Sequence, residues 1–124
     1  MEQLAQLDKA LEAHAKWKAR LRMAIAMGKC ETPISQIRAD DRCDFGKWLK
    51  GPAAQGPIAR SSHFAEVKRL HAAFHQEAAR VATAAGEGRK DVAEKAMATN
   101  GTYASASAAL TNALFAWKWE LERP

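Results

Sequence analysis

The stretch SSHFAEVKRLHAAFHQEAARVATAAGEG, residues 61 to 88, decides the fold. Its core-facing positions recur at alternating intervals of three and four residues: Phe64, Val67, His71, Phe74, Ala78 and Val81. This spacing is typical of the buried face of an amphipathic α-helix. The two serines favour an N-cap, Glu66 lies near the capping-box position, and Gly86-Glu87-Gly88 favours a helix end. We therefore predict a helix from Ser61 or Ser62 to Gly86 with a histidine on its core stripe.

A second amphipathic segment runs from Glu2 to about Lys29. Its stripe has the same spacing and consists of Leu4, Leu7, Leu11, His14, Trp17 or Lys18, Leu21 and Ile25. Thr32-Pro33 forces the chain out of the helix, because the residue before a proline is disfavoured in the α region. The sequence therefore predicts a first long helix that also places one histidine on its buried face.

The last segment, residues 90 to 122, follows a seven-residue pattern: Ala96, Asn100, Tyr103, Ser107, Leu110, Leu114, Trp117 and Leu121. We expect one helix here, in which Gly101 marks close packing or a slight bend rather than a break. The turn at Gly86-Glu87-Gly88 is short, so the helices on either side of it should be antiparallel.

The middle of the chain carries a cysteine between two of these long segments. Residues 34 to 50 are predicted to form one or two short helical pieces, with Asp40 and Asp41 placed to cap the piece that carries Cys43. Residues 51 to 62 are rich in Gly, Pro and Ser and predict turns rather than regular structure. The fold class expected is all-α: an antiparallel four-helix bundle with an additional short helix carrying Cys43, in a single domain over residues 1–124.

Composition narrows the classes of protein. The chain has 124 residues, 48% of them hydrophobic, which is enough for one core without disulfides. It has two cysteines and no secretory signature, so a cytoplasmic location is expected. No stretch approaches the roughly 18 to 20 apolar residues of a spanning helix, so we expect no membrane insertion.

The net charge of +5 could indicate a nucleic-acid partner. The densest basic residues alternate along the first helix and so lie on different sides of it: Lys16, Lys18, Arg20 and Arg22. No aromatic residues are interleaved in a basic run and no recognition-helix signature is present. A solvated basic face is favoured, and no nucleic acid is expected as a partner.

His71 and His75 are one helical turn apart, so both rings could hold one metal ion. Spacing alone leaves an alternative of similar weight, a core His71 and a solvent-facing His75. The balance changes because His14 and Cys43 could converge with this pair in the core of an antiparallel bundle. Three imidazoles and a thiolate are donors that zinc prefers, and four protein ligands leave no open position for water, so we do not expect an enzyme.

Three motifs occur in order: His14-Ala-Lys-Trp17, then Cys43-Asp-Phe45-Gly46-Lys-Trp48-Leu49, then His71-Ala-Ala-Phe74-His75. From about Leu11 to Leu114 the chain resembles the chemoreceptor zinc-binding (CZB) domain. The resemblance implies a helical bundle that binds one Zn²⁺ per chain through His14, Cys43, His71 and His75. It also implies a homodimer within bacterial signalling, with an output domain or partner protein of the chemoreceptor or diguanylate cyclase type. Apolar walls would come from Trp17, Phe45, Trp48 and Phe74, with Gly46 allowing tight passage, although ordinary core roles are preferred for them.

The leading hypothesis is a sensor domain of bacterial signal transduction that changes bundle conformation on metal binding or release. Cys43 is the expected switch ligand, because it lies on a short segment rather than on a long packed helix. Two alternatives stay open. One is a redox sensor in which hypochlorous acid or peroxide acts on zinc-bound Cys43, and the other is a structural zinc site in a dimerisation module. Cys30 and His63 lie outside the motifs.

Overall fold

A computed structural model describes residues 2–122 of the chain, and these contain helices and no strand. The predicted all-α class is confirmed. Three helices are long: α1 (Glu2–Met27), α5 (Ser62–Gly86) and α7 (Thr102–Glu122). The shorter elements are α2 (Ile34–Arg38), α3 (Asp44–Lys50), α4 (Pro52–Gln55), the 3-10 turn η1 (Pro57–Arg60) and α6 (Lys90–Met97).

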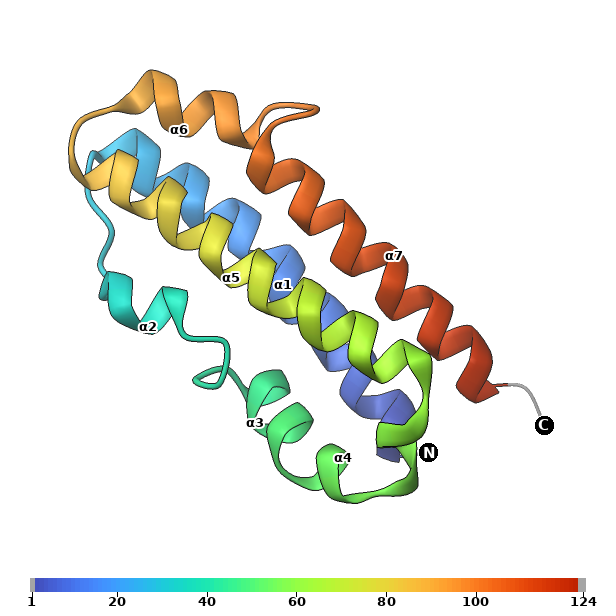
Figure 1. Ribbon diagram of the computed structural model, residues 1–124. Coiled ribbons are helices and arrows are strands. Elements are labelled where there is room, and N and C mark those ends of the chain that lie inside the picture. The colour runs from blue at the N-terminus through green and yellow to red at the C-terminus, as the bar shows by residue number, and fades with distance from the viewer. Residues whose placement is uncertain (1, 123–124) are drawn as a thin grey trace.

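The chain runs back and forth along one axis (Figure 1). It advances along α1, returns through α2, α3 and α4, advances again along α5, and returns through α6 and α7. Helix α5 is the centre of the bundle, since it contacts α1, α2, α6 and α7. The predicted four-helix bundle is present, and its second member is the segmented α2–α4 run rather than one continuous helix.

The core follows the stripes that the sequence predicts. On α1, Leu7 and Leu21 are fully buried, and on α5 so are Val67 and Phe74. In the seven-residue pattern of the last segment, Tyr103, Leu110, Leu114 and Trp117 are buried, whereas Leu121 is partly buried. No helix in the described part of the chain is both long and apolar enough to cross a membrane.

The expectation of one helix over residues 90 to 122 was wrong. Helix α6 ends at Met97 and α7 begins at Thr102. Between them Asn100 adopts a left-handed conformation with φ of 71°, and the Gly101 amide donates to the Ala98 carbonyl. A Cβ on Gly101 would meet the carbonyl oxygens at the end of α6. The glycine therefore does allow close packing, but it does so where the chain turns sharply between two helices.

Two expectations for the middle segment were also wrong. Neither Asp40 nor Asp41 caps the helix after them, because the N-cap of α3 is Cys43. Residues 51 to 62 form the two helical turns α4 and η1 instead of irregular structure. Each begins with a proline, Pro52 or Pro57, whose fixed φ favours the first position of a helix. Helix α5 is capped as predicted, by Ser61, whose hydroxyl accepts from the His63 amide.

Candidate metal centre

Three separate segments bring four donor side chains to the middle of the bundle. His14 comes from α1, Cys43 from the turn before α3, and His71 and His75 from α5. One ligand atom of each lies within 4.8 Å of all the others. The three histidines are buried and Cys43 is half-buried. The structure thus gathers the four residues that the sequence singles out into one candidate metal site.

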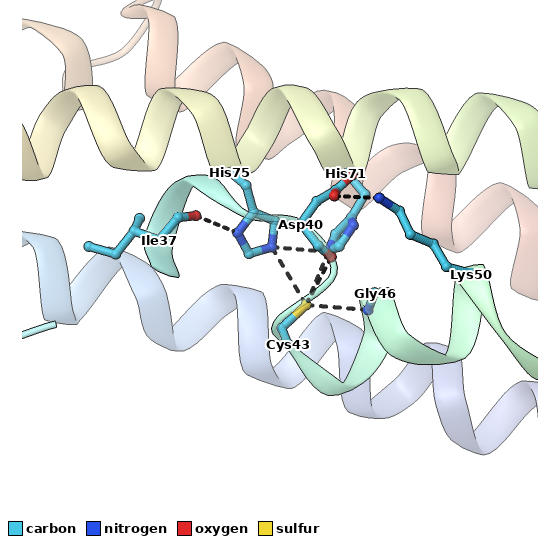
Figure 2. A network of polar contacts seen from close by, with 7 residues as sticks. All are labelled: Ile37, Asp40, Cys43, Gly46, Lys50, His71 and His75. Atoms are coloured by element: carbon cyan, nitrogen blue, oxygen red, sulfur yellow. Dashed lines mark hydrogen bonds and ion pairs between the residues drawn. The ribbon is translucent and has the colours of Figure 1, made fainter. Parts of the chain in front are cut away.

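The distances between donor atoms can be compared with a tetrahedral zinc site (Figure 2). His71 Nε2 lies 3.1 Å from His75 Nε2, and Cys43 Sγ lies 3.3 Å and 3.6 Å from those two nitrogens. Bonds of about 2.0–2.1 Å to nitrogen and 2.3 Å to sulfur give tetrahedral edges of about 3.3 Å between nitrogens and about 3.6 Å between nitrogen and sulfur. These three atoms therefore form a triangle close to one face of that tetrahedron.

Two backbone carbonyls orient two of the three imidazole rings. His14 Nδ1 donates to the Ala10 carbonyl at 2.7 Å, one turn earlier in α1. His75 Nδ1 donates to the carbonyl of Ile37 at 2.9 Å, and Ile37 is a buried residue in the last turn of α2. A ring that donates from Nδ1 presents the lone pair of Nε2, which is the form that a metal ligand needs. The four donors thus fit zinc in chemical type, and the rings of His14 and His75 are in the tautomer that a metal ligand needs.

Burial keeps these groups uncharged when no metal is present. It lowers the pKa of His14 to about 4, against a raising effect of the Ala10 carbonyl, and it also lowers the pKa of His75. The pKa of His71 is lowered to about 2, mainly by burial and to a smaller extent by repulsion from His75 and His14. Burial raises the pKa of the Cys43 thiol. At pH 7 the histidines are ready to bind a metal, whereas Cys43 must lose its proton to do so.

The turn that carries Cys43 depends on a glycine. As the N-cap of α3, Cys43 accepts a hydrogen bond on Sγ from the Gly46 amide at 3.3 Å. A Cβ on Gly46 would overlap the carbonyl oxygen of Asp40, which belongs to the residues leading into the turn. Gly46 therefore lets the turn lie directly on α3, which gives a physical reason for the glycine three residues after the cysteine.

Aromatic residues surround the histidines in two layers. Phe74 and Phe45 contact His14 edge-on, with ring centroids 5.0 Å and 6.0 Å away, and Phe45 also lies 5.1 Å from His71. Trp48 is stacked on Phe45 at 5.8 Å and lies behind it. Of the wall residues suggested by the sequence, the two phenylalanines touch the donors directly.

Trp17 borders a groove that reaches the site from solvent. This groove has a volume of about 600 Å³ and its lining includes His14, Cys43 and His75. The Arg20 guanidinium lies 3.8 Å above the Trp17 ring. Cationic residues predominate among its charged lining residues, with Lys9, Lys16, Arg20 and Arg42 against Glu12 and Asp44. Half-buried Cys43 thus borders a groove whose charged lining is mainly cationic, which favours the approach of small anions.

The residues outside the motifs lie away from the donors. Cys30 is absent from the cluster, and His63 Nε2 lies 2.8 Å from a carboxylate oxygen of Glu120. Sequence reasoning missed the two orienting carbonyls, because a backbone group leaves no trace in the residue type. It also missed the ion pair between Asp40 and Lys50 at 2.7 Å, which joins two surface residues of common types.

Comparison with known proteins gave one result. A family model described as the chemoreceptor zinc-binding domain matches residues 14–82. The matched region begins at His14, includes the other three donors and extends over most of α5. A search of curated proteins found no match. A search of solved structures found none either.

Proposed function

Since this chain belongs to the chemoreceptor zinc-binding domain family, a family of regulatory sensor domains and not a known enzyme family, we propose that it senses zinc through His14, Cys43, His71 and His75. The observation that carries the proposal is the convergence of these donors, with all ligand atoms within 4.8 Å of one another. Three buried imidazoles and one thiol match the preference of zinc for nitrogen and sulfur.

A bound zinc ion would connect three parts of the bundle. His14 would attach α1 to the metal, His71 and His75 would attach α5, and Cys43 would attach the turn between α2 and α3. A bound zinc ion would supply the positive charge that keeps Cys43 as a thiolate at neutral pH. We propose Cys43 as the ligand that leaves first, because it is half-buried and lies between two short helices, where local opening costs less than in a long helix.

The output would come from the segment that Cys43 holds. Helix α2 packs on α5 and α3 packs on α1, so release of Cys43 would loosen contacts with both long helices. We propose that this change is transmitted within a homodimer to a signalling domain or partner of the chemoreceptor or diguanylate cyclase type. On α7, Phe115 and Trp119 are 53% and 62% exposed and lie one turn apart, which offers apolar surface for such an association. Residues 1–124 would act as one domain.

Native mass spectrometry of the purified chain tests the ligand assignment. We expect one zinc per chain, lost on treatment with a chelator, and loss of zinc in His71→Ala and Cys43→Ser at a free zinc concentration that saturates the wild type. Matched controls are His63→Ala, on the same helix as His71, and Cys30→Ser, which changes the other cysteine. A full zinc content in both ligand variants would refute the assignment.

The groove that reaches Cys43 favours a second candidate function, oxidant sensing. Without metal the thiol is protonated at neutral pH, because burial raises its pKa, and a protonated thiol reacts slowly. With zinc bound it would be a thiolate open to peroxide or hypochlorous acid. In a Cys30→Ser background, we expect these oxidants to modify Cys43 and release zinc together, as followed by mass spectrometry and a zinc dye. Zinc that stays bound at doses that oxidise free thiols would exclude this candidate.

A further inference from the structure

An ion pair lies beside the turn that carries Cys43 (Figure 2). Lys50 Nζ is 2.7 Å from Asp40 Oδ1, and the two side chains are 41% and 19% exposed. Asp40 comes three residues before Cys43, and Lys50 is the last residue of α3. The pair therefore links the chain entering the turn to the far end of the helix that follows it.

Other contacts hold the same turn on both sides. The Ile37 carbonyl before it accepts from His75, and the Gly46 amide after it donates to Cys43 Sγ. Between these points the Asp40 carbonyl oxygen lies against Gly46, 3.9 Å from Cys43 Sγ. Asp40 thus holds the turn against α3 with its backbone and reaches the end of α3 with its carboxylate.

We propose that the Asp40–Lys50 ion pair is a clasp that sets how fast Cys43 leaves a bound zinc ion. The inference rests on the proposed zinc function. If the turn lifts away from the histidines while α3 stays packed on α1, Asp40 moves away from the end of α3, so the ion pair breaks as the turn lifts. Asp40 and Lys50 are positioning residues, because neither belongs to the donor cluster and both act through the Cys43 turn.

A purely electrostatic role would have a different signature. The positive charge of Lys50 acts on the site, because it helps to lower the pKa of His71. Burial contributes most to that lowering, followed by His75 and His14, and Lys50 comes after them. Such a charge repels a cation, so its removal would slow zinc release. The Asp40 charge attracts a cation, so its removal would speed release. A clasp instead requires that removing either partner speeds release, and Lys50 therefore distinguishes the two roles.

Zinc release from the loaded full-length chain to an excess of a chromogenic chelator provides the test. We expect Lys50→Met and Asp40→Asn each to speed release about two- to fivefold, the range that a partly exposed ion pair supports. Lys50→Arg should release zinc at nearly the wild-type rate. Lys47→Met, which removes an exposed charge from the same helix, should have little effect. Release from Lys50→Met that is equal to or slower than wild-type release overturns the proposal.

A second measurement needs no metal. Hydrogen–deuterium exchange of residues 40–49 in the chelated chain reports opening of the turn, because the Gly46 amide is bonded to Cys43 Sγ. We expect faster exchange in Lys50→Met and Asp40→Asn, and wild-type exchange in Lys50→Arg. If the wild type holds no zinc, the proposed function fails, and the exchange still shows whether the ion pair holds the turn closed. Unchanged exchange, or faster exchange without faster zinc release, overturns the clasp.

Discussion

Removing zinc from the loaded chain is expected to lower its melting temperature by about 10–20 °C without unfolding it. Binding at 100 to 1,000 times the dissociation constant adds about 2.7–4.1 kcal/mol to the free energy of unfolding. For a domain of this size, about 1 kcal/mol corresponds to about 3–6 °C. The measurement is a circular dichroism melt of the loaded and chelated chain at the same protein concentration.

The metal-free bundle should stay folded because its core extends well beyond the donors. Leu7, Leu110 and Trp117 are fully buried on α1 and α7, and none of them belongs to the donor set. The three histidines are neutral at pH 7, so their burial without metal leaves no buried charge. Loss of helicity and of a cooperative transition on chelation would instead favour a purely structural zinc site. An unchanged melting temperature would contradict zinc binding itself.

Gly46→Ala is expected to destabilise the chain by about 1–3 kcal/mol and to weaken zinc binding about 10- to 100-fold. Helix propensity alone predicts the opposite sign, since alanine is better than glycine inside a helix by about 0.5–1 kcal/mol. The clash decides the outcome, because the new Cβ would meet the backbone carbonyl of Asp40, which has no flexible side chain to move aside. Urea denaturation and competitive zinc titration measure the two effects.

Gly86→Ala is the matched control for this substitution. Gly86 is also helical, at the end of α5, and a Cβ there has nothing within 4 Å to meet. It should raise the free energy of unfolding by about 0.5–1 kcal/mol and leave zinc affinity unchanged. If Gly46→Ala behaved like Gly86→Ala, the close packing of Asp40 on Gly46 would not hold the Cys43 turn in place.

Most of the fold could be predicted from residue patterns. The stripes that carry His14 and His71 show which faces of α1 and α5 are buried, because helical periodicity is a local property of the chain. The same patterns failed at Gly101, where a glycine suits close packing in a continuous helix as well as a sharp turn. They also failed at Asp40, a good capping residue by type that makes an ion pair instead, while a cysteine takes the cap.

The sequence by itself determined the donor types, the one-turn spacing of His71 and His75, and the presence of His14 on a buried stripe. Only the tertiary structure decided that Cys43 meets these rings, because that contact joins segments 28 residues or more apart in the chain. It also decided which ring nitrogen faces the site, through the Ile37 and Ala10 carbonyls. Every residue carries a backbone carbonyl, so the residue type does not show which carbonyl will meet a histidine ring. The packing of the helices decides that.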